Sequence, residues 1–122
     1  MVAFSANDPR TATLIDSTTV SGVGYLLTND STNNKVDLTA NNEIAIGVSA
    51  GESSRDANLD LETTGATVSF FPLNGVMMIA SQASQTYTTG ALVYVQASGL
   101  VGTTSSSRKL LGVYVGEGET TS

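Results

Sequence analysis

Four carboxylates near the middle of the chain are the side chains best placed to do chemistry. They are Glu52, Asp56, Asp60 and Glu62. Apolar and polar residues alternate over 58–62, which predicts a strand with Leu59 and Leu61 facing the core. Asp60 and Glu62 would share the opposite face, where they could hold a cation or act as an acid–base pair. Charges on the solvated face of an edge strand, which discourage strand pairing, are the stronger interpretation of the same pattern.

The side chains of the commonest metal, redox and nucleophilic sites are missing. The chain has no histidine and no cysteine, which removes the thiol nucleophile, the usual general base and most transition-metal ligands. The loop 29–34 is rich in Asn and Asp, but it lacks the glycine and the glutamate of a hand-like calcium loop. No Gly-Lys-Ser/Thr sequence follows Gly22-Val23-Gly24, as a phosphate-binding loop requires. We therefore predict a protein without enzyme activity, cofactor or metal.

Four tyrosines offer a possible binding surface. Tyr25, Tyr87, Tyr94 and Tyr114 could stack on sugar rings, but most of them lie among Val and Leu, and the chain has no Trp. Packing in the core or at its edge is the stronger interpretation. The alternative functional hypothesis is a β-sandwich binding module, an adhesin or carbohydrate-binding domain displayed on a virion or cell surface.

Composition and charge exclude several classes of partner. The chain has 122 residues, 40% of them hydrophobic and 13% charged, which fits one folded domain rather than a disordered segment. Its net charge is −6, and its five basic residues are scattered at Arg10, Lys35, Arg55, Arg108 and Lys109. Nucleic acids and anionic membranes attract clustered Lys and Arg, so we predict neither partner. With no signal-peptide pattern and no long apolar run, we expect synthesis in the cytoplasm.

A weak internal repeat at a spacing of 65–66 residues organises the elements. Three segments recur, 24–27 as 90–93, 36–38 as 100–101, and 44–48 as 109–113. Each copy predicts a glycine-led strand, a polar loop, a short return and a closing strand that contains Gly-Val. Two copies are too few for a solenoid, so we expect one β-unit used twice in a single small core.

The other local signals are also typical of strands. Residues 19–28 and 35–39 predict a hairpin across a loop of turn-forming residues. In 66–71, Val68 and Phe70 share one face, opposite Thr67 and Ser69. Asn74-Gly75 is the strongest hairpin-turn signal. The segments 76–80 and 92–95 are apolar on both faces, which predicts cover by a second layer or by another subunit.

No segment has a sustained helical period, so the predicted fold class is all-β, with at most one or two short helices. We divide the chain into an N-terminal arm over 1–18, a β domain over 19–116 and a polar C-terminal tail over 117–122.

A series of short motifs in a fixed order resembles a known family. The series is Ile46-Gly47-Val48, Gly65-Ala66-Thr67-Val68, Asn74-Gly75-Val76, Gly90-Ala91-Leu92-Val93-Tyr94, Ser98-Gly99-Leu100-Val101 and Leu111-Gly112-Val113. Over about residues 20–116 it resembles the small capsid decoration (cement) proteins of tailed phages that have a compact β-barrel-like, or β-tulip, domain. The end departs from the family pattern, in which one more strand often follows.

The resemblance implies a structural role on the outer surface of the virion. Such proteins dock on an expanded icosahedral head, commonly as homotrimers, and clamp neighbouring major capsid protein subunits, often through an N-terminal arm. We predict that Val2, Phe4 and Arg10 contact the capsid, since two apolar residues and a cation stand out in this otherwise polar arm. Met77, Ile79 and Tyr94, from the segments apolar on both faces, are the candidate contacts between subunits.

Overall fold

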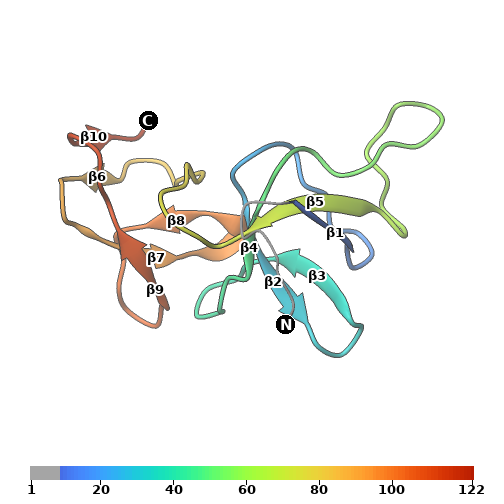
Figure 1. The fold of residues 1–122 in the computed structure, drawn as a ribbon, viewed down its shortest axis with the longest axis horizontal. Helices are drawn as coiled ribbons and strands as arrows, with labels where there is room; N and C mark the ends of the chain where they lie inside the picture. The colour runs from blue at the N-terminus through green and yellow to red at the C-terminus, as the bar shows by residue number, and fades with distance from the viewer. Residues whose placement is uncertain (1–8) are drawn as a thin grey trace, which may run out of the picture.

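The computed structural model describes residues 9–122, and its regular elements are almost all short strands, joined by long turns and loops (Figure 1). They are β1 (Arg10–Thr13), β2 (Leu26–Asp30), β3 (Lys35–Leu38), β4 (Gly47–Ser49), β5 (Thr67–Pro72), β6 (Thr86–Tyr87), β7 (Leu92–Val95), β8 (Val101–Gly102), β9 (Leu110–Val113) and β10 (Glu119–Thr120). Among the described residues the only helical element is one 3-10 turn, η1 (Ala97–Gly99). The predicted all-β class is confirmed. None of the helices in this part of the chain could cross a membrane.

Five strands form a small barrel-like sheet. Their order is β1-β5-β4-β2-β3, and all neighbouring pairs are antiparallel. A parallel bridge between Leu14 and Val36 then joins the chain after β1 to β3, where the Ile15 N–H donates to the Val36 carbonyl at 3.0 Å. This bridge closes the sheet on itself, so the outer strands of the order are not left as long open edges.

The barrel encloses the first of two apolar clusters. Its buried members are Leu14, Val20, Leu27, Val36, Ala66 and Val68. The predicted faces of β5 are confirmed, because Val68 is buried here and Phe70 packs against the cluster while Thr67 and Ser69 are exposed. The predicted hairpin between 19–28 and 35–39 is confirmed in its pairing, although its first strand covers only Leu26–Asp30. The Asp30 carboxylate holds its turn by accepting the N–H groups of Thr32 and Asn33.

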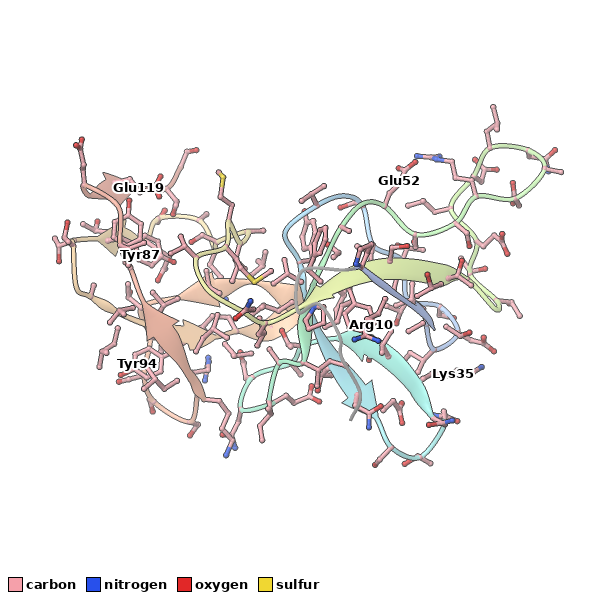
Figure 2. All side chains as sticks on the ribbon, viewed as in Figure 1. Arg10, Lys35, Glu52, Tyr87, Tyr94 and Glu119 are labelled. Atoms are coloured by element: carbon pink, nitrogen blue, oxygen red, sulfur yellow. The ribbon has the colours of Figure 1, made fainter. Side chains whose placement is uncertain are left out.

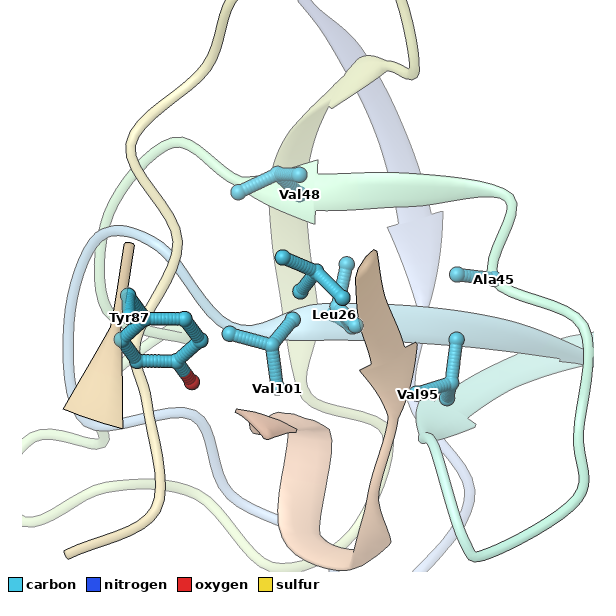
Figure 3. Close-up of a cluster of buried hydrophobic side chains, with 7 residues drawn as sticks. Leu26, Ala45, Val48, Tyr87, Val95 and Val101 are labelled. Carbon is cyan, nitrogen blue, oxygen red and sulfur yellow. The ribbon is translucent and has the colours of Figure 1, made fainter. Parts of the chain in front are cut away.

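A second sheet packs against the outside of the barrel. Its order is β8-β7-β9, and it lies beside the barrel at the left of Figure 1. Val93, Val95 and Val101 of this sheet meet Leu26 and Val48 of the barrel in a second buried cluster (Figure 3). The core therefore consists of two clusters, one on each side of β2 and β4, rather than the single core expected from the repeat.

The internal repeat is confirmed in the strand pairing. In the first copy β2 is central, with β3 and β4 on its two sides; in the second copy β7 is central, with β8 and β9 on its two sides. Leu27 pairs with Gly47, and Val93 pairs with Gly112. Both members of the second pair lie 65 or 66 residues after their counterparts. We call β2, β3 and β4 the first unit and β7, β8 and β9 the second unit.

Two predicted strands are wrong. Residues 58–62 form no strand, and Leu59, predicted to face the core, is 73% exposed with a φ of 66°. Residues 76–80 form no strand either, so the turn at Asn74-Gly75 joins no hairpin. The polar segment 117–122 contains a strand that the sequence did not predict, since Glu119 and Thr120 form β10 and pair with β6. This pairing with a distant segment is a contact that local patterns do not reveal.

The described part of the predicted arm includes a strand of the barrel. Arg10–Thr13 pairs with β5, and Leu14 is fully buried. Only residues 1–8 lie outside the described chain.

Candidate functional site

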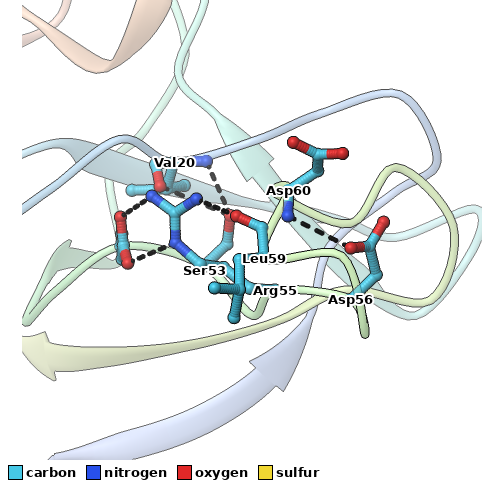
Figure 4. Close-up of polar contacts among 7 residues, drawn as sticks. Val20, Ser53, Arg55, Asp56, Leu59 and Asp60 are labelled. Atoms are coloured by element: carbon cyan, nitrogen blue, oxygen red, sulfur yellow. Dashed lines mark hydrogen bonds and ion pairs between the residues drawn. The ribbon is translucent and has the colours of Figure 1, made fainter.

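The carboxylates that opened the sequence analysis lie on an exposed loop and do not form a catalytic pair. The Asp56 carboxylate accepts the N–H groups of Asn58 and Asp60, at 2.8 and 3.1 Å, and so shapes the turn that replaces the predicted strand (Figure 4). The described residues contain no group of three His, Cys, Asp or Glu side chains that could hold a metal ion. The Asp56 carboxylate therefore serves to form this turn.

Glu52 and Arg55 form the one ion pair of the described chain. Arg55 donates through Nε and Nη2 to the two carboxylate oxygens of Glu52, at 2.8 and 2.7 Å. The hydrogen bond from Arg55 lowers the pKa of the Glu52 carboxyl below its usual value. Both side chains are well exposed, so the pair contributes little to stability. The pair joins two residues of the same loop that lie three positions apart in the sequence.

The predicted capsid contacts are only partly described. Val2 and Phe4 lie outside the described residues. Arg10 is the first residue of β1, opposite Phe70, and its side chain is exposed (Figure 2). The structure therefore places a cation on the barrel surface directly after the undescribed segment.

An apolar groove of about 750 Å³ lies over the second unit. One wall is the segment 73–79, and the other is β9 with the residues that follow it as far as Gly116. The floor includes Tyr87 and Val93. Of the predicted subunit contacts, Met77 and Ile79 line this groove and pack partly against the second cluster.

Two tyrosines close one side of the groove. The rings of Tyr87 and Tyr114 stack with centroids 5.3 Å apart. The Tyr114 hydroxyl donates to Glu119 at 3.2 Å, and the Tyr87 hydroxyl lies 2.7 Å from that of Ser81. Burial against these neighbours, and then the Glu119 charge, raise the pKa of Tyr114 above its ordinary value. Because Tyr87 is buried and stacked on Tyr114, its ring faces serve packing rather than sugar stacking.

The outer face of the second unit is apolar and exposed. Tyr94, the third predicted subunit contact, is half-buried on β7 opposite Leu110. The neighbouring pair is Leu92 and Val113, which are 49% and 55% exposed. Opposite residues on paired strands point to the same face, so these four side chains form one patch. The sequence analysis named only Tyr94 of them, although β9 is apolar at positions of both parities, as a strand with two covered faces would be.

Strand β9 is an open sheet edge. Its only strand partner in the described chain is β7. The Tyr114 N–H donates to the Ala91 carbonyl at 2.8 Å, toward β7, so the backbone groups of Val113, one residue earlier, point away from β7. The other edge of this sheet is covered, because Val101 of β8 exchanges hydrogen bonds with Ala80 and Gln82. Open backbone groups and exposed apolar side chains therefore coincide along β9.

Comparison with known proteins gives no match to any protein family, curated protein or solved structure.

Proposed function

We propose that this protein decorates and stabilises the outer surface of an icosahedral phage capsid by clamping neighbouring major capsid protein subunits, without catalysing a reaction. One observation carries the proposal. The apolar interior of the barrel is buried, whereas the second unit leaves an apolar groove, an apolar sheet face and a strand edge uncovered. Surfaces of this kind mark protein–protein contacts. The order of the sequence motifs, with their resemblance to decoration proteins, makes a capsid the favoured setting.

The division of contacts follows the positions of the residues. Residues 1–8 and Arg10 are proposed to meet the capsid, since the exposed guanidinium of Arg10 extends the segment that carries Val2 and Phe4. The second unit and the groove beside it are proposed to supply contacts between copies of the protein, because Tyr94 lies on β7 while Met77 and Ile79 line the groove. Many copies acting together then bind a repeated lattice far more tightly than one copy alone.

Co-sedimentation with phage heads that lack the protein tests the proposal. The full chain should sediment with expanded heads and saturate at a fixed ratio to the major capsid protein. A deletion of residues 2–8 should lose this binding while its unfolding stays cooperative. The deletion must stop before Arg10, because removing β1 would open the barrel at its pairing with β5.

A matched substitution refines the result. Arg10→Glu should weaken head binding, whereas Lys35→Glu, a charge reversal at another barrel strand, should leave it unchanged. A full chain that stays in the supernatant with every form of head would contradict the proposed function.

A further inference from the structure

The structure assigns a partner to the open edge of β9: we propose that β9 of a second copy pairs with it, antiparallel and about a two-fold axis. This joins the two second units into one continuous sheet, in the order β8-β7-β9-β9-β7-β8. The inference concerns the contact between copies and goes beyond the proposed binding to capsids.

The first unit supplies the template for this pairing. There β4, the counterpart of β9, has β5 as an antiparallel partner on its outer side, with Gly47 opposite Pro72 and Val48 opposite Phe71. The outer side of β9 holds no such strand in the described chain. A Cβ at Gly47 would overlap the Phe70 ring, whereas a Cβ at Gly112 would meet open space. The second unit thus has the same edge without its cover.

The side chains of β9 favour pairing with a further strand, whereas charged side chains on several other strands oppose it. Sheet edges are usually protected by charged residues. β1 carries Arg10, β3 carries Lys35 and Asp37, and β10 carries Glu119, but Leu110–Val113 contains no charge. An uncharged edge strand with outward-pointing backbone groups is a template for another strand.

Charge complementarity selects an antiparallel second copy as that strand. Lys109 lies just before β9, and Glu117 lies four residues after Val113. A two-fold axis at Val113 brings Lys109 of one copy beside Glu117 of the other, and the same contact occurs twice by symmetry. A parallel arrangement would instead set like charges side by side.

The exposed apolar surface around β9 is of the size that a dimer needs. Its members are Val76, Met78, Leu92, Leu110, Val113 and Val115, with exposures from 49% to 91%. Together they offer on the order of several hundred Å² of apolar surface, which approaches the roughly 800 Å² that each partner contributes to a standard interface. Closed two-fold pairing is also the commonest form of homo-oligomer.

Sedimentation velocity of the full chain at several concentrations tests the pairing. The expected species is a dimer of about 25 kDa, twice the chain mass of 12.5 kDa. Val113→Lys sets two ammonium groups against each other at the axis and should weaken the dimer by more than about 100-fold. The control is Val23→Lys, at a position just before β2 that is 68% exposed, and it should leave the dimer intact.

A charge exchange identifies the register. Lys109→Glu and Glu117→Lys should each weaken the dimer by roughly fivefold to tenfold, because each creates like-charged neighbours. The double variant restores opposite charges and should recover the dimer, which a loss of folding could not do. Since head binding is measured separately, failure here does not touch the capsid proposal.

Three outcomes would overturn the pairing. They are a wild-type chain that stays monomeric at every concentration, a trimer, as the resemblance implies, and a dimer whose strength Val113→Lys does not change. A dimer lost on deletion of residues 2–8 would also overturn it, since the contact would then belong to that segment.

Discussion

The two units of the repeat have the same strand pairing and different surroundings. In the first unit, Leu26 and Val48 are 0% and 2% exposed, because the second unit covers them. Their counterparts Leu92 and Val113 are 49% and 55% exposed. On its other face the first unit is enclosed by the barrel. One unit is therefore part of the core on both faces, and the other has an open face and an open edge.

This difference shows that a repeated sequence pattern determines which strands pair but not which side chains are buried. Strand pairing depends on residues within each unit. Gly47 lies opposite Leu27 in the first unit, and Gly112 lies opposite Val93 in the second. Burial depends on segments outside the unit: the second unit covers Leu26 and Val48 on one face, and β1, β5 and the residues around Leu14, which have no second copy, complete the barrel on the other. Matched substitutions at equivalent positions can measure how much those extra segments contribute.

The largest difference is expected between Leu26→Ala and Leu92→Ala. Leu26 is fully buried between the barrel and the second sheet, so its truncation should lower the free energy of unfolding by about 2–5 kcal/mol. In the monomer, Leu92→Ala should cost less than about 1 kcal/mol, because half of the side chain is in water there. Denaturant unfolding at one fixed protein concentration measures both values. Equal losses would show that the two faces are equally covered in solution.

The next difference is expected between Gly47→Ala and Gly112→Ala. A methyl group at Gly47 would collide with the Phe70 ring and the Phe71 carbonyl, and should destabilise the protein by about 1–3 kcal/mol. Nothing lies near a methyl group at Gly112, and removing a strand glycine should leave stability unchanged or raise it by up to about 1 kcal/mol. Thermal unfolding of the two variants gives the comparison, and a destabilised Gly112→Ala would contradict the open space beside β9.

A smaller difference is expected between Gln96→Ala and Asp30→Ala, two positions 66 residues apart in the repeat. The buried Gln96 amide donates to the Thr104 carbonyl and accepts from Arg108 Nε at 2.7 Å. Its loss should cost about 1–3 kcal/mol. Asp30 holds only an exposed turn, and its loss should cost about 0.5–1.5 kcal/mol. Denaturant midpoints that rank the two variants in the opposite order would contradict this assignment.

The smallest effect is a pH dependence at the groove. The raised pKa of Tyr114 means that folding favours the neutral phenol. Its contribution to stability is present below the ordinary tyrosine pKa of about 10 and is lost as the pH rises through the higher folded value. Absorbance titration should show one phenol that ionises late in the wild type and is missing in Tyr114→Phe. Identical late titration in both proteins would place the shift at another tyrosine.

Local patterns predicted the β2–β3 hairpin, whose strands are close in sequence, and the two faces of β5, whose partners are distant. The β2–β3 hairpin and the faces of β5 follow from turn residues and alternation, and the repeat predicted the order within each unit. The strand over 58–62 failed because Asp56 accepts backbone N–H groups and bends the chain there, a competition that alternation does not reveal. β10 was missed because its partner β6 lies more than thirty residues earlier.

Less of the candidate site than of the fold could be predicted from the sequence. Met77, Ile79 and Tyr94 were named because their segments are apolar on both faces; Tyr94 lies on the second unit, and Met77 and Ile79 line the groove beside it. The exposure of Leu92, Leu110 and Val113 could not be predicted, since the buried Leu26 and Val48 are of the same residue types in equivalent places. What separates them is the second unit, which covers Leu26 and Val48, whereas no segment of the described chain covers Leu92 and Val113 in the same way; this is a property of the assembled chain.

The closure of the barrel by β1 also sets the order in which the chain folds. Arg10 pairs with Phe70, 60 residues further along the chain, whereas Leu27 pairs with Leu38 across a short hairpin. Closing the longer loop costs about 1.5 kcal/mol more in chain entropy, so we expect β1 to join after the β2–β3 hairpin has formed. Until then the barrel exposes β5 as a second unprotected edge. Refolding yield at high concentration, rather than equilibrium stability, is therefore the quantity most sensitive to changes in β1.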